Sequence, residues 1–124
     1  MTQRKAAYWA STGFAALALS ATGIADLLRV PAIMEGLAHL GYPAYFATIL
    51  GTWELLGAAA IVAPDLPRVK EWAYAGMFFA LSGAALSHAA SGDPVSKVLV
   101  PLVVLGAVAV SWMLRSRAAV LRSS

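Results

Sequence analysis

Four long apolar segments fill most of this chain and restrict what it can fold into. They cover residues 6–28, 44–63, 72–90 and 95–114, and short polar stretches connect them. Each supplies roughly the 17–25 apolar residues that a helix needs to cross a bilayer. Because backbone polar groups in lipid must be hydrogen-bonded within the protein, we predict an all-α, integral membrane four-helix bundle.

The composition supports one membrane domain over residues 1–124. Hydrophobic residues make up 60% of the chain and charged residues 12%, whereas soluble domains have about 45–50% and about 25%. The apolar run of residues 6–28 exceeds the roughly 7–15 residues of a signal-peptide core, so we interpret it as a membrane helix. The chain has no cysteine, which excludes thiolate metal sites and redox chemistry on its own thiols.

The basic residues predict the orientation of the bundle. Only Arg29 and Lys97 fall on one side of the four segments, and the other seven fall on the opposite side: Arg4, Lys5, Arg68, Lys70, Arg115, Arg117 and Arg122. The positive-inside rule therefore places both termini in the cytoplasm. The net charge of +3 follows from this topology, so we expect the lipid bilayer and no nucleic acid as a partner.

A short helix is predicted over residues 32–40, between the first and second membrane helices. Ile33 and Leu37 share one face of this segment, and Glu35 and His39 share the other. Such a segment is typical of an amphipathic helix that lies in the membrane interface. We expect Glu35 and His39 to belong to its solvated face.

Glu54 is the first candidate for function because it lies near the middle of the second apolar segment, between Gly51 and Gly57. A charge at that depth costs about 2.5–3.5 kcal/mol on insertion scales, and such residues usually have a function. Without a cationic partner in low dielectric, the side chain is driven to its neutral form. We predict that Glu54 handles protons or binds a ligand through hydrogen bonds. The structural alternative is one interhelical hydrogen bond of the neutral acid.

Two further ionisable residues are embedded in the apolar segments, Asp26 in the first and His88 in the third. We predict that they join Glu54 in a ligand pocket among the first three membrane helices, with Trp53 in its wall. Small residues such as Gly51 either leave space for the pocket or allow close approach of the helices. In the structural alternatives, Asp26 pairs with Arg29, His88 caps a helix end, and Trp53 only packs.

No metal site is predicted from Asp26, Glu54 and His88, since they lie on different helices without a ligand spacing signature. In the turn Ser91–Gly92–Asp93–Pro94 before the last helix, we expect Asp93 to serve as an N-cap.

Three stretches carry a resemblance to a known family: TGIADLLR (22–29), GYPAYFATILGTWELLGAAAIVAPDLPRVKEWAYAGM (41–77) and SHAASGDP (87–94). The chain resembles the DoxX-like family of small four-helix membrane proteins over nearly its whole length. The most specific parts are the G-x-x-E-x-x-G core around Glu54 and the turn from His88 to Pro94. The family is named for small subunits of thiosulfate:quinone oxidoreductase, so the resemblance implies a role in a membrane redox system.

We therefore expect a small subunit or accessory of a quinone-linked oxidoreductase system, with quinone or another apolar molecule bound near Glu54. A redox partner protein and further copies of the chain are the expected protein partners. Whether the chain itself catalyses a reaction stays open. The alternatives are a non-catalytic scaffold or assembly factor and a small proton-coupled transporter.

Overall fold

The computed structural model describes residues 2–123, and it describes side chains for residues 2–115. Every regular element in this part of the chain is an α-helix, which confirms the all-α prediction. The five helices are α1 (Gln3–Leu27), α2 (Pro31–Leu40), α3 (Phe46–Val62), α4 (Pro67–Ala90) and α5 (Val95–Ser123).

The helix ends differ from the predicted ranges where polar residues continue a helix beyond its apolar stretch. α4 begins at Pro67, five positions before the apolar segment, because proline suits the first helical turn and the basic residues after it remain helical. α5 likewise extends beyond position 114 to Ser123. α2 ends at Gly41, whose φ of 87° closes the helix in the left-handed region that glycine favours.

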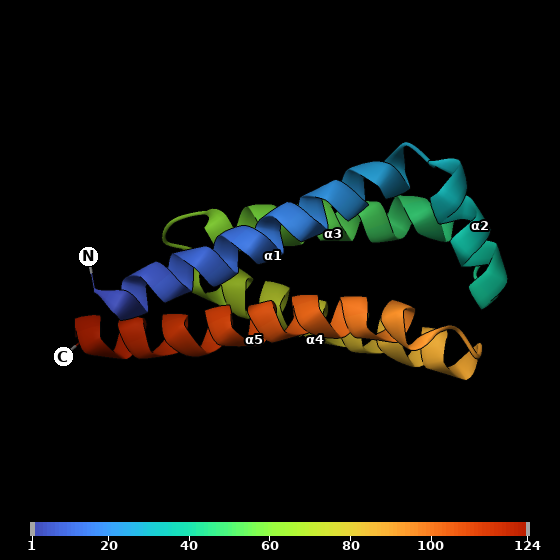
Figure 1. Cartoon of the computed structure of the whole chain (residues 1–124). Coiled ribbons are helices and arrows are strands. Elements are labelled where there is room, and N and C mark those ends of the chain that lie inside the picture. The colour runs from blue at the N-terminus through green and yellow to red at the C-terminus, as the bar shows by residue number, and fades with distance from the viewer. Residues whose placement is uncertain (1, 124) are drawn as a thin grey trace.

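The four long helices form two neighbouring pairs, α1 with α3 and α4 with α5 (Figure 1). α1 also contacts α5, and α3 also contacts α4, so each long helix has two main neighbours. Figure 1 shows both ends of the chain at one end of the bundle and α2 at the other. The short helix α2 contacts α1 and α3.

The core of the bundle combines small apolar side chains with a buried hydroxyl network. Ser111 of α5 is fully buried and is hydrogen-bonded to Thr12 of α1 and to the Tyr74 hydroxyl, the latter at 2.7 Å. Buried hydroxyls cost stability unless they are hydrogen-bonded, and these three satisfy one another. Around them pack the core side chains Ala15, Leu19, Ala58, Ile61, Met77 and Val108.

A glycine contact holds α1 close to α3. A Cβ atom placed on Gly51 would lie 2.7 Å from the carbonyl oxygen of Gly23, and a Cβ placed on Gly23 would lie 3.1 Å from the carbonyl oxygen of Gly51. The two backbones therefore touch where side chains would separate them, as small residues permit in helix pairs within membranes. The next glycine of α3, Gly57, has no such contact, because its nearest neighbour would be a Met77 atom at 3.9 Å.

Two helices of the described chain are long and apolar enough to cross a membrane, α1 and the Val95–Arg115 part of α5. α3 is a shorter apolar helix of 17 residues. Large apolar side chains are exposed on all four long helices, among them Leu17, Leu56, Phe79 and Val100. Exposed apolar surface on this scale is typical of proteins that contact lipid.

Candidate functional site

Glu54 and Asp26 lie together where α1 meets α3. The Asp26 side chain is 3% exposed and neighbours the Glu54 carboxyl group. The glycine contact brings them together: a Cβ on Gly51 would meet the Cβ of Asp26 at 3.0 Å, and a Cβ on Gly23 would meet that of Glu54 at 3.3 Å. Close approach of the two backbones therefore positions both acids.

Glu54 is only partly buried, and the Thr22 hydroxyl group is its hydrogen-bond partner. The same hydroxyl lies 3.0 Å from the carbonyl oxygen of Ala18, one helical turn earlier. A threonine has a single hydroxyl hydrogen, so it cannot donate to both groups at once. The hydroxyl group donates to one of them at a time, and so links the Glu54 carboxyl group of α3 to the backbone of α1.

Arg29 does not form the ion pair with Asp26 that the sequence left open. Its guanidinium group donates to the Thr48 hydroxyl at 3.3 Å, and the ion pairs found among residues 2–115 do not include Asp26. Arg29 lies just after α1 with a φ of 52°, and this turn directs the chain away from the helix. Asp26 and Glu54 thus form a pair of acids beside a hydroxyl group.

The structure places His88 in a different cluster, and not beside Glu54. Its Nδ1 lies 2.6 Å from one carboxylate oxygen of Asp93, while Nε2 of His39 lies 2.6 Å from the other. The hydrogen bond from His88 has the largest effect on the pKa of Asp93, and that from His39 the second largest. Together they hold this pKa below its usual value of 3.8. Asp93 therefore links two histidines, where the sequence interpretation gave it only a capping role and gave His39 a solvated one.

The turn between α4 and α5 explains why Asp93 reaches His88. Gly92 has a φ of 73°, which lets the chain reverse immediately after α4, and the backbone NH of Asp93 donates to the His88 carbonyl at 3.0 Å. The side chain of Asp93 then lies over the last turn of α4. Sequence reasoning missed this pair because it depends on the backbone conformation of Gly92.

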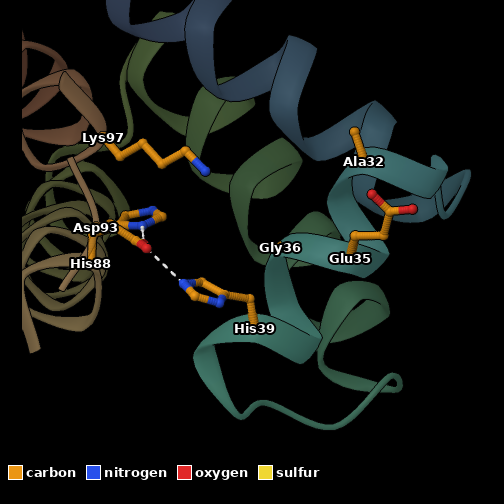
Figure 2. A pocket seen from close by; sticks show the side chains of 7 residues that line it. All are labelled: Ala32, Glu35, Gly36, His39, His88, Asp93 and Lys97. Carbon is orange, nitrogen blue, oxygen red and sulfur yellow. Dashed lines mark hydrogen bonds and ion pairs between the residues drawn. The ribbon is translucent and has the colours of Figure 1, made fainter. Parts of the chain in front are cut away.

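Beside this cluster is a cavity of about 390 Å³ between α2 and the start of α5 (Figure 2). Its lining consists of Ala32, Glu35, Gly36, His39, His88, Asp93 and Lys97. In Figure 2 the Lys97 side chain extends across the space toward α2 and α3. Neither Glu54 nor Asp26 lines this cavity, so the predicted pocket is divided into two sites.

Trp53 lies on the surface of α3, whereas Gly51 lies inside the bundle. Trp53 is 63% exposed, and its role in ligand binding stays a prediction. Gly51 is buried in the α1–α3 contact and leaves no space for a ligand. Within residues 2–115, no three histidine, aspartate or glutamate side chains have the arrangement of a metal site.

Comparison with known proteins gives one result that covers most of the chain. The model of the DoxX-like family matches residues 10–112, a range that contains both clusters. No curated protein and no solved structure matched the chain.

Proposed function

We propose, from the finding that this chain belongs to the DoxX-like family, that it is a small accessory subunit of a quinone-linked redox system. In this proposal it spans the bacterial inner membrane four times and binds a quinone or another apolar molecule with a polar head group. The observation that carries the proposal is the partly exposed Glu54, paired with Thr22 beside Asp26 on otherwise apolar helices.

The four-span topology is supported by charge and by helix length. Seven of the nine basic residues fall on the side of the termini, which the positive-inside rule assigns to the cytoplasm, and Figure 1 has both termini at one end. The 17 residues of α3 extend about 26 Å at 1.5 Å per residue, close to the roughly 30 Å of the hydrocarbon core. In this topology α2 lies at the outer surface.

Glu54 is suited to bind the carbonyl group of a quinone that enters from the bilayer. A neutral carboxyl group can donate a hydrogen bond to a quinone oxygen and accept one at its second oxygen. Its partial exposure beside apolar side chains leaves it within reach of a lipid-soluble molecule. Asp26 is the neighbouring group that can take up or supply the proton of Glu54.

The test is ligand analysis of the protein purified in mild detergent or nanodiscs, by mass spectrometry and absorption spectroscopy, followed by titration with a short-chain quinone. We expect stoichiometric quinone in the wild type. Glu54→Gln should keep the bound quinone but lose proton exchange, and Glu54→Leu should lose both.

The matched control is Thr52→Val on the same helix, because Thr52 is exposed and donates only to the Thr48 carbonyl of its own helix. It should leave quinone content unchanged. Quinone content that is equal in the wild type and Glu54→Leu would refute the role of Glu54. A protein without ligand that still copurifies with a redox enzyme would instead favour the scaffold.

A further inference from the structure

Two hydrogen-bonded links between distant parts of the chain hold the region of α2 against the end of α4 and the turn after it. His39 of α2 is held by Asp93, and the Tyr42 hydroxyl just after α2 is 2.7 Å from that of Ser87. Figure 2 shows the first of these links, from His39 to Asp93, and both residues line the cavity. Its volume of about 390 Å³ falls in the range of about 300–1,000 Å³ that small-molecule sites occupy.

Asp93 sets the chemistry of both imidazole rings. An ionised carboxylate only accepts hydrogen bonds, so each histidine must present an N–H to it: Nε2 of His39 and Nδ1 of His88. In a neutral ring the other nitrogen is then a hydrogen-bond acceptor. In His88 this acceptor is Nε2. A carboxylate behind an imidazole also stabilises the imidazolium that forms when the ring takes up a proton. His88 is therefore arranged as a proton acceptor.

The charges around the cavity select the kind of molecule that can enter. The lining has two carboxylates, Glu35 and Asp93, and one ammonium group, Lys97. A ligand that arrives as an anion meets an excess of negative charge while the histidines are neutral. A neutral weak acid avoids this repulsion, and after it transfers its proton its anion is stabilised by Lys97 and by the new imidazolium.

We propose that this cavity binds the hydroquinone head group of a quinol, with His88 accepting one phenolic proton and Lys97 stabilising the resulting phenolate. In this step the phenolic O–H bond breaks and an N–H bond forms on His88, and no electron is transferred. The inference rests on the proposed quinone-linked function and adds a second site to it. Glu54 would donate to a quinone carbonyl, whereas the cavity would accept the proton of the reduced form.

The experiment uses a nitrophenol whose phenolate absorbs visible light, added to the purified full chain at a pH at which the free probe is protonated. We expect a saturable phenolate spectrum with the wild type. A short-chain quinol should displace the probe, and the dimethyl ether of that quinol, which has no O–H, should not. His88→Gln and Lys97→Gln should each weaken phenolate binding about tenfold or more, as expected for hydrogen bonds to charged groups.

Asp93→Asn tests the positioning role, because it removes the charge behind His88 while keeping a similar shape. The variant should still bind the probe, but as the neutral phenol at the same pH, a spectral change that loss of packing would not produce. Ser96→Ala is the matched control, since Ser96 is an exposed neighbour of Lys97 in sequence and does not line the cavity. It should behave as the wild type.

The outcomes separate this inference from the proposed function. If quinol binds and depends on Glu54, but the probe gives no phenolate spectrum or ignores His88→Gln and Lys97→Gln, only the cavity proposal is overturned. If the probe gives a phenolate spectrum but a short-chain quinol does not displace it, the assignment of the ligand is overturned. Absence of any quinone or quinol binding overturns both proposals.

Discussion

Replacing Gly51 with alanine should destabilise the bundle, whereas the same change at Gly57 should not. Both glycines lie within α3, so both substitutions gain the same helix propensity, about 0.5–1 kcal/mol for glycine to alanine. At Gly51 the new methyl group would lie 2.7 Å from the Gly23 carbonyl oxygen, which is backbone and cannot rotate away. At Gly57 it would lie 3.9 Å from Cγ of Met77, an ordinary contact.

The comparison isolates the cost of the close approach, because the propensity gain cancels between the two variants. Overpacking a tight contact costs typically about 1–3 kcal/mol, and this is the expected difference in the free energy of unfolding. Gly23→Ala should fall between the two, since its methyl group would meet neighbours at 3.1–3.3 Å. The predicted order of stability is Gly57→Ala, then Gly23→Ala, then Gly51→Ala.

The assay is SDS-induced unfolding in mixed micelles, followed by tryptophan fluorescence, with the wild type and the three variants in the same detergent. Far-UV circular dichroism before titration would verify that each variant is helical at the start. Equal unfolding midpoints for Gly51→Ala and Gly57→Ala would refute the argument, because they would mean that α1 and α3 are not in backbone contact.

Three further predictions concern topology, pH and the core. Reporter fusions at the C-terminus and within α2 should report cytoplasm and periplasm respectively, and a periplasmic signal at the C-terminus would contradict the charge argument. Because hydrogen bonds from the histidines lower the pKa of Asp93 below 3.8, their stabilising contribution is present above pH 3.8 and is lost as the pH falls through the folded-state pKa. Spin labels on Ala38→Cys and Ser91→Cys, in this cysteine-free chain, should thus keep a narrow distance distribution from pH 7 to about pH 5 and broaden only under stronger acid. Adding His39→Leu, which removes the link from α2 to Asp93, should broaden the distribution throughout. Ser111→Ala should lower the unfolding free energy by about 1–3 kcal/mol, because two buried hydroxyl groups lose their shared partner, and an unchanged SDS midpoint would count against that network.

Hydropathy located the helices of this chain because apolar length is a local property of the sequence. The positions of Gly51 and Glu54 on α3 were also recognisable, since a carboxyl group and small residues stand out in an apolar segment. The pairing of His88 was not recognisable by the same reasoning. It depends on the φ of 73° at Gly92, which returns Asp93 over the end of α4, and on the placement of α2 beside that turn.

The sequence interpretation grouped Asp26, Glu54 and His88 into one pocket because each is an ionisable residue in an apolar segment. That property does not show which helices are neighbours, so it does not show which of the three residues are in contact. α1 and α3 are held together by two glycines, so their acids meet, whereas His88 lies on α4 and faces the turn that leads into α5. Helix pairing, which depends on the packing of small residues, decided which polar groups became neighbours.

The two clusters differ in the proton chemistry that they can support, and this difference follows from their surroundings. Glu54 lies among apolar helices with a hydroxyl and a second acid as neighbours, which favours a neutral carboxyl group that donates hydrogen bonds. His88 and His39 hold the Asp93 carboxylate beside Lys97, which leaves Nε2 of a neutral His88 as a hydrogen-bond acceptor. A molecule that is protonated at one site and deprotonated at another needs both kinds of group. The presence of both within one small bundle is therefore the strongest reason to test quinone and quinol on the same protein, because a scaffold needs its polar groups only to hold its helices together.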